Sequence, residues 1–244
     1  MNLSNIPKFV VNLERRPDRL EHIKKEMEYI GWDFELFKAI DLNNHGGCSL
    51  SHFEILKLAK ERNYESVMVI EDDCTFLPYS KSLINKIENE TDDFEFGVIN
   101  FAPTLNRPVL QSSIQPLFLD ITNLPPKKEH ERGIFATNFM LYHNSIYDGV
   151  MEIAKPENLG YYAIDDFIYQ FVYPRKQSYS PILPLAPQIS SWSDVSQGQY
   201  NNFYTQTYNW NLYSPFKIPT EFLNGVNLKE LKENNIHKDF YYVS

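Results

Sequence analysis

The chain has 244 residues, enough for one large domain or two small ones, and 15% of them are aromatic. That aromatic content is typical of a folded protein and excludes an intrinsically disordered chain. The formal net charge of −9 disfavours general nucleic-acid binding, so we expect no nucleic-acid partner. Two cysteines, Cys48 and Cys74, are too few for a disulfide framework and predict free thiols in a reducing compartment.

The sequence also carries no signal for membrane insertion or export. Residues 1–11 lack a basic region followed by a long apolar core, and no stretch approaches the roughly 18 apolar residues of a membrane span. We therefore expect no signal peptide, no transmembrane segment and a cytoplasmic location. The oligomeric state does not follow from the sequence.

Apolar periodicity predicts alternating strands and helices in the first hundred residues. Strands are predicted at 9–11, 34–40, 67–70 and 94–101, and helices at 17–30, 51–62 and 80–90. Pro17 suits the first turn of its helix and Gly31 its end, while Ser51 and Glu54 have the spacing of a capping box. This alternation predicts the α/β fold class with a mainly parallel central sheet.

The regular alternation stops after residue 101. Residues 103–131 are rich in proline and lack periodicity, which predicts a flap or an insertion on the acceptor side. A strand is predicted at 134–142, and helices at 145–154, near residue 165 and at 227–233. Residues 196–214 are rich in Asn, Gln, Tyr and Trp, which indicates a sugar-facing or loosely packed surface.

Three carboxylates, Glu71, Asp72 and Asp73, directly follow the apolar strand at 67–70. Ligands of open α/β sheets bind at the C-terminal ends of the strands. Adjacent carboxylates repel one another, and Mg²⁺ or Mn²⁺, which prefer hard oxygen ligands, are the simplest neutralisers. A solvated acidic turn is the alternative that this run alone leaves open.

A basic turn follows the first strand and contains Asn12, Arg15, Arg16 and Arg19. Guanidinium groups beside the free N–H groups of a helix N-terminus suit a phosphate or a nucleotide. A solvated surface patch of basic residues can have the same sequence pattern, so the turn alone does not decide between such a patch and a phosphate site.

Other polar residues have both a structural and a functional interpretation. His52 lies in the first turn of its predicted helix, where a histidine is more often a structural hydrogen-bonding group than a catalyst. Gly46 and Gly47 predict a close approach of the backbone to another group. Asp165 and Asp166 lie at the head of a predicted helix, where the helix dipole also stabilises carboxylates.

Five stretches, taken together and in order, resemble glycosyltransferase family 25, which contains bacterial lipooligosaccharide galactosyltransferases and procollagen galactosyltransferases. They are VVNLERRPDR, GGCSLSHFEIL, VMVIEDDC, AIDDF and LPLAPQISSWSDV, and they cover roughly residues 8–195. The loop between Ile40 and Gly46 is short for the family, and the tail after Ser196 has no counterpart in it.

The resemblance implies a GT-A fold in a single domain, 1–244. This domain has a nucleotide-binding half (about 1–101), an acceptor-side half (about 102–195) and a C-terminal extension (about 196–244). Glu71 and Asp73 are implied to hold Mn²⁺ or Mg²⁺, with Asp73 as the direct ligand, and the cation stabilises the leaving diphosphate. The residues implied to bind the UDP-sugar donor are Asn12, Arg15, Arg16, Arg19, Ser51, His52, Asp72 and Asp194.

The characterised branches of this family invert the configuration at the anomeric carbon of the sugar. Inversion requires a base that deprotonates the acceptor hydroxyl. Asp165 or Asp166 is the candidate, and with an ordinary pKa of about 4 either is ionised at neutral pH. The implied reaction moves galactose or glucose from a UDP-sugar to a hydroxyl group of a glycan or glycoprotein acceptor. The alternatives are a metal-dependent hydrolase and a non-catalytic member of the fold that binds nucleotide-sugars or glycans.

Overall fold

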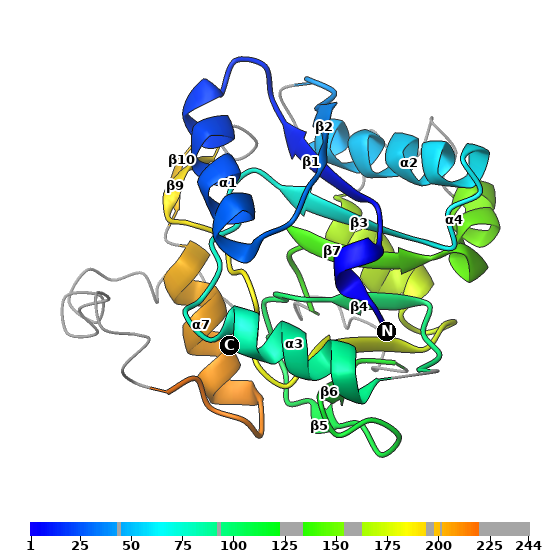
Figure 1. The fold of residues 1–244 in the computed structure, drawn as a ribbon, viewed down its shortest axis with the longest axis vertical. Coiled ribbons are helices and arrows are strands. Elements are labelled where there is room, and N and C mark those ends of the chain that lie inside the picture. Colours follow the sequence, from blue (N-terminus) through cyan, green and yellow to red (C-terminus); the bar gives the residue numbers. More distant parts are fainter. Residues whose placement is uncertain are drawn as a thin grey trace, which may run out of the picture.

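A mixed eight-stranded sheet forms the centre of the molecule, and helices pack on both of its faces (Figure 1). The computed structural model describes residues 1–42, 45–91, 94–122, 134–153, 163–193, 198–200 and 202–219. Within these residues, no helix combines the length and the apolar character that are needed to cross a bilayer.

The strands of the sheet are β1 (Lys8–Asn12), β2 (Glu35–Lys38), β3 (Ser66–Glu71), β4 (Val98–Asn100), β5 (Leu110–Gln111), β6 (Phe118–Asp120), β7 (Phe139–His143) and β8 (Ser178–Pro181), and a separate pair consists of β9 (Ser191–Ser193) and β10 (Gly198–Tyr200). The helices are α1 (Pro17–Ile30), α2 (His45–Glu61), α3 (Ser80–Glu90), α4 (Tyr147–Ile153), α6 (Ile164–Phe167) and α7 (Asn202–Tyr213). Shorter turns are η1 (Leu3–Asn5), η2 (Asn144–Ile146) and the π-helical turn η3 (Ile168–Val172).

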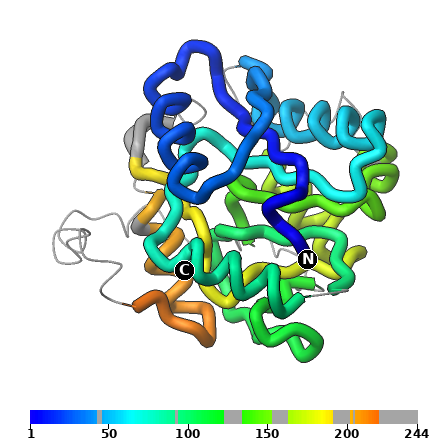
Figure 2. The backbone as a smooth tube through the Cα atoms, in the orientation of Figure 1, coloured from blue at the N-terminus to red at the C-terminus, as the bar shows by residue number. Residues whose placement is uncertain are grey.

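The strands do not all run in one direction. The order in the sheet is β2-β1-β3-β7-β4-β8-β6-β5, and β6 and β7 run opposite to the other strands. The predicted α/β class is confirmed, but the sheet is mixed rather than mainly parallel. The parallel prediction holds for β2, β1 and β3, which α1 and α2 connect by crossovers and which lie in the upper part of Figure 2.

Strand β3 shows why the sheet is covered on both faces. Its side chains alternate, so Val67 and Val69 pack in the core under α2, α4 and α6, while Met68 and Ile70 pack in the core under α1 and α3. All four are fully buried. This explains why the sequence of β3 is an unbroken apolar run rather than an alternating one.

Local signals correctly predicted α1 and α3. Helix α1 begins at Pro17 and ends before Gly31, whose φ of 82° is the left-handed conformation that glycine adopts at helix ends. Helix α3 covers the predicted residues 80–90. By contrast, β4 and β7 are shorter than the ranges 94–101 and 134–142 that were predicted for them.

The predicted start of α2 is wrong. The helix begins at His45, so the Ser51–Glu54 spacing lies inside it and does not cap it. The Ser51 hydroxyl instead donates to the Gly47 carbonyl oxygen at 2.8 Å and accepts from the Ile40 amide at 2.9 Å. These bonds attach the first turns of α2 to the segment after β2, and Gly47 allows the close approach that was predicted for the glycine pair.

Replacing Gly47 by Ala should destabilise the protein by about 1–3 kcal/mol, the usual range for an overpacked site. A Cβ there would overlap the Ile40 carbonyl oxygen and lie 3.2 Å from the Leu42 amide nitrogen, and both are backbone atoms that cannot rotate away. Gly149→Ala in α4 is the matched control, because its Cβ would meet nothing within 4 Å. That change should stabilise the helix by about 0.5–1 kcal/mol. Urea unfolding measures both, and equal effects would contradict the packing argument.

Two regions for which the sequence predicted no strand and no helix before residue 227, the proline-rich region and the C-terminal extension, contain parts of the packed fold. Strands β5 and β6 lie within the proline-rich region and extend the sheet beyond β8. Helix α7 lies in the C-terminal extension, and its Trp210 is fully buried in the core. Strands of two or three residues are too short for a recognisable periodicity, which is why the sequence did not predict them. Residues 123–131 and the helix predicted at 227–233 lie outside the described residues.

Candidate functional site

The acidic run and the basic turn meet at the ends of two neighbouring strands. Strands β1 and β3 are parallel and Val11 pairs with Glu71, so Asn12 and Asp72 follow at the same edge of the sheet. The Asn12 side chain donates to Asp72 Oδ2 at 2.6 Å and to the Arg16 carbonyl oxygen at 3.1 Å. This amide therefore connects the acidic run directly to the basic turn.

Arg19 of the basic turn reaches the acids. Its Nη1 atom lies 3.1 Å from Asp72 Oδ1 and 3.3 Å from Asp73 Oδ2. The three side chains are 12%, 8% and 7% exposed, respectively, so the two carboxylates are withdrawn from water. One guanidinium group thus faces two buried carboxylates, with a third acid, Glu71, next to them in the chain.

Two buried carboxylates share the charge of one guanidinium group among the residues that the structure describes. Burial, followed by the charge of Glu71, raises the pKa of Asp73 to about 7, although the charge of Arg19 opposes the shift. Burial also raises the pKa of Asp72, against the charge of Arg19 and the hydrogen bond from Asn12. A divalent cation would stabilise the ionised form of both carboxylates and so lower both pKa values. The carboxylate oxygens are the hard ligands that Mn²⁺ and Mg²⁺ prefer.

Asp73 has a second partner that the sequence analysis did not select. The Gln188 side-chain amide lies 3.4 and 3.3 Å from the two Asp73 carboxylate oxygens, and the Ile189 amide donates to the Asp73 carbonyl oxygen at 2.7 Å. The Gln188 backbone amide donates to the side-chain oxygen Oε1 of Gln206 in α7 at 2.6 Å. Gln188 lies within the stretch LPLAPQISSWSDV, which was the available signal; nothing in the sequence indicated Gln206.

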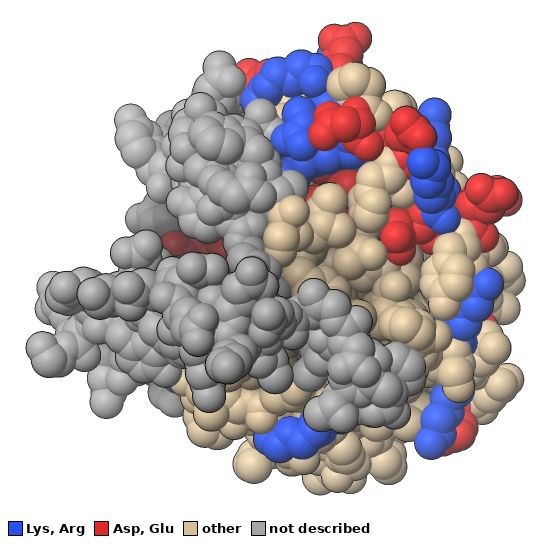
Figure 3. Space-filling view, turned by 90° about the vertical axis from the view of Figure 1, so that its left-hand side faces the viewer, with Lys and Arg blue, Asp and Glu red and all other residues tan. Residues whose placement is uncertain are grey.

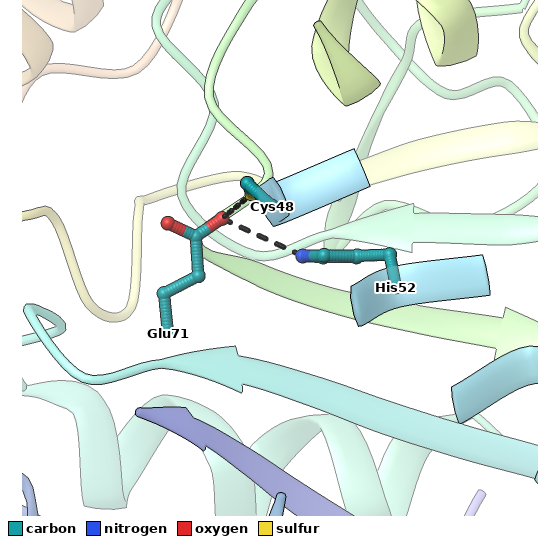
Figure 4. A group of neighbouring side chains, drawn as sticks. All are labelled: Cys48, His52 and Glu71. Atoms are coloured by element: carbon teal, nitrogen blue, oxygen red, sulfur yellow. Dashed lines mark hydrogen bonds and ion pairs between the residues drawn. The ribbon is translucent and has the colours of Figure 1, made fainter. Parts of the chain in front are cut away.

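Glu71 faces a different set of residues from Asp72 and Asp73 (Figure 4). Its Oε1 atom lies 3.6 Å from Cys48 Sγ, 3.5 Å from His52 Nε2 and 3.5 Å from Thr137 Oγ1. Burial raises the pKa of Glu71, but the neighbouring His52, Cys48 and Arg19 side chains together outweigh this effect and lower the pKa overall. The three adjacent acids therefore do not converge on one point.

Asp165 and Asp166 lie in the first turn of α6, as predicted. The Asp165 carboxylate accepts from the Asp166 amide at 2.9 Å and from the Ala136 amide at 3.5 Å. Ala136 has a φ of 64°, which is rare for a residue other than glycine. Burial, followed by the charge of Asp166, raises the pKa of Asp165, and Glu71 adds to this shift. The expectation of an ordinary pKa is therefore wrong for Asp165.

Several residues predicted to bind the donor have internal partners. Arg15 forms an ion pair with Asp41, and Arg16 lies 2.8 Å from Asp18. Acidic and basic side chains are accordingly interspersed in the upper part of Figure 3. Ser51 is fully buried and bonded to two backbone groups, so it is a poor candidate for direct contact with a nucleotide.

His52 and Asp194 were also predicted to bind the donor. His52 is also fully buried, and its two ring nitrogens face Tyr142 and Glu71. Direct contact between His52 and a nucleotide therefore does not fit this arrangement. Asp194 lies outside the described residues.

Comparison with known proteins gives consistent sequence matches. Glycosyltransferase family 25 (LPS biosynthesis protein) matches residues 5–46 and 45–132. A glycosyltransferase 25 family member of Aedes aegypti is 30% identical over 116 residues, which cover 36% of this chain and 19% of that protein. One of Drosophila pseudoobscura pseudoobscura is 27% identical over 146 residues, which cover 48% of this chain and 23% of that protein. The chain thus spans about a fifth of the length of these relatives.

Among solved structures, a glycosyltransferase involved in glycosylation of the major capsid of PBCV-1 is 11% identical, with a TM-score of 0.45 over 72% of this chain and 80% of that chain. A mutant of Drosophila beta-1,4-galactosyltransferase 7 in complex with manganese, UDP-Gal and xylobiose is 13% identical, with a TM-score of 0.38 over 95% of this chain and 80% of that chain. Similarity at this level supports no assignment of function. The family match, however, extends over more than half of the sequence, and on that basis this chain belongs to glycosyltransferase family 25.

Proposed function

We propose that this chain transfers a hexose, galactose or glucose, from a UDP-sugar to a hydroxyl group of a glycan or a protein. The observation that carries the proposal is the contact of the buried Asp72–Asp73 pair with Asn12 and Arg19 at the edge of the sheet. In a member of this family, this contact places carboxylates that can bind a metal beside a guanidinium group and helix α1. A guanidinium group and a helix N-terminus both suit a diphosphate.

Asp73, supported by Asp72, would hold Mn²⁺ or Mg²⁺. The fit rests on two buried carboxylates that Arg19 alone does not neutralise, and on the raised pKa of Asp73. When bound, the cation supplies positive charge for the leaving diphosphate. Arg19 adds a fixed positive charge at the same place, and Asn12 and Gln188 hold the carboxylates in position.

Asp165 is the better candidate for the base that takes the proton of the acceptor hydroxyl. Its pKa is raised, and a stronger base accepts a proton more readily at neutral pH. Asp165 accepts from the Ala136 amide, and the next residue, Thr137, lies 3.5 Å from Glu71, which supports a location of Asp165 near the acidic run. The Ala136 amide, held in an uncommon backbone conformation, orients the Asp165 carboxylate.

A screen of nucleotide-sugars tests the proposal. In the presence of Mn²⁺, UDP-galactose or UDP-glucose at about 100 times its Kd should stabilise the protein by roughly 2.7 kcal/mol, which raises the Tm by about 5–10 °C. EDTA should reverse the shift, and UDP should be released on addition of a hydroxyl acceptor. A chain that no nucleotide-sugar stabilises with any divalent cation would contradict the proposal. Cleavage of phosphodiesters without sugar transfer would instead identify a hydrolase.

A further inference from the structure

We propose that Cys48, His52 and Glu71 form a second metal site, which takes Zn²⁺ or a similar borderline-soft divalent ion. This inference stands independently of the transferase proposal, because it concerns a different set of ligands. It also explains why Glu71, which the sequence assigned to the same cation as Asp73, faces helix α2 (Figure 4).

The geometry of the three ligand atoms fits a tetrahedral ion. Cys48 Sγ, His52 Nε2 and Glu71 Oε1 all lie within 4.8 Å of one another, with Sγ 3.6 Å and Nε2 3.5 Å from Oε1. In a tetrahedral zinc site, with bonds of about 2.0–2.3 Å, neighbouring ligand atoms are roughly 3.3–3.6 Å apart. The two separations from Glu71 Oε1 are thus close to the edges of a zinc tetrahedron, and the third, between Cys48 Sγ and His52 Nε2, is within 4.8 Å.

His52 provides a second, independent observation. Its side chain is fully buried, and its Nε2 atom makes no hydrogen bond among the described residues although it is aimed at Glu71. The other ring nitrogen, Nδ1, lies 3.1 Å from the Tyr142 hydroxyl. In the tautomer in which Nδ1–H donates to Tyr142, the lone pair of Nε2 faces the cluster. This is the usual arrangement of a metal-bound histidine, whose second nitrogen is fixed by an outer hydrogen bond.

Helix α2 and strand β3 bring the ligands together. Cys48 and His52 are four residues apart on α2, so their side chains lie on the same face of the helix. Gly47 fixes the first turn of this helix against Ile40 and Leu42. Glu71 comes from the end of β3, and its side chain is 20% exposed, which gives an ion access from solvent.

The ligand types of this cluster favour Zn²⁺, whereas those at Asp73 favour a different cation. A thiolate and a carboxylate balance the charge of one divalent ion, and a neutral imidazole completes the set. Thiolate and imidazole select Zn²⁺, whereas the oxygen ligands of Asp72 and Asp73 select Mn²⁺ or Mg²⁺. A catalytic triad fits less well, because the thiol and the imidazole both face the same carboxylate oxygen rather than each other in series.

Cobalt binding is the direct test, since Co²⁺ reports thiolate coordination by a charge-transfer band in the near ultraviolet. Reduced, chelator-treated protein should bind one Co²⁺ per chain with this band, and Zn²⁺ but not Mn²⁺ should displace it. Cys48→Ser should abolish the band, and His52→Gln should weaken Co²⁺ binding at least about 10-fold. Tyr142→Phe, which removes only the outer hydrogen bond, should weaken binding by about 10-fold.

Cys74→Ser is the matched control, because Cys74 is the second free cysteine of the chain and lies outside the cluster. It should keep the band, and so should Asp73→Asn, even if the transferase proposal fails. Wild-type protein without the band would overturn the inference, as would a band that persists in folded Cys48→Ser protein. Circular dichroism establishes folding for each variant. If Cys48→Ser does not fold, the absence of an effect of His52→Gln and Tyr142→Phe on binding would overturn the inference.

Discussion

Asp73→Asn should lower Mn²⁺-dependent sugar transfer by about 10²–10³-fold, the loss typical of removing one preorganised charge-stabilising group. Asparagine keeps the size of the side chain but removes the charge that would hold the cation next to the leaving diphosphate. The affinity for UDP in the presence of Mn²⁺ should fall with it. Steady-state UDP release and calorimetric titration of UDP with and without Mn²⁺ measure the two effects.

Stability separates this loss of function from misfolding. The folded-state pKa of Asp73 is about 7, above its ordinary value of 3.8. An acid with a raised pKa contributes stability below its unfolded-state value, and this contribution is lost as pH rises through the folded-state value. In EDTA above pH 7, Asp73→Asn should therefore be more stable than the wild type. Asp148→Asn, the same substitution at an exposed position of α4, is the control and should leave sugar transfer unchanged. Undiminished UDP affinity in Asp73→Asn with Mn²⁺ present would refute the ligand role.

Asp165→Asn should retain donor binding and lose transfer by about 10²–10⁴-fold, the usual contribution of a general base. The base acts when deprotonated, so the rate should fall as pH decreases through its pKa. Because the pKa of Asp165 is raised, this decrease should occur at a higher pH than for an ordinary aspartate. The variant should lose this acid limb of the profile of kcat against pH, together with most of its activity.

Asp166→Asn is the matched change at the neighbouring position and should keep the acid limb. Full activity in Asp165→Asn with loss in Asp166→Asn would exchange the two roles. Normal turnover in both variants would place the base elsewhere. Donor binding, measured by the Mn²⁺-dependent shift in Tm, must remain in each variant for the comparison to concern the base.

The sequence by itself determined the features that depend on neighbours along the chain. Pro17 and Gly31 mark the ends of α1, and the apolar run at 67–70 followed by three acids predicted both β3 and its functional edge. Such signals are contained in windows of a few residues, so no knowledge of distant packing is needed.

The tertiary structure decided which side chains meet across the chain. Gln188 reaches Asp73 over a separation of 115 residues, and the early start of α2 turns Cys48 and His52 towards Glu71. Strand order and register set these contacts, and they result from burying both faces of the sheet rather than from any local pattern. For the same reason the sequence read Glu71, Asp72 and Asp73 as one cluster, whereas alternation along β3 and the position of α2 divide the acids between two sets of partners.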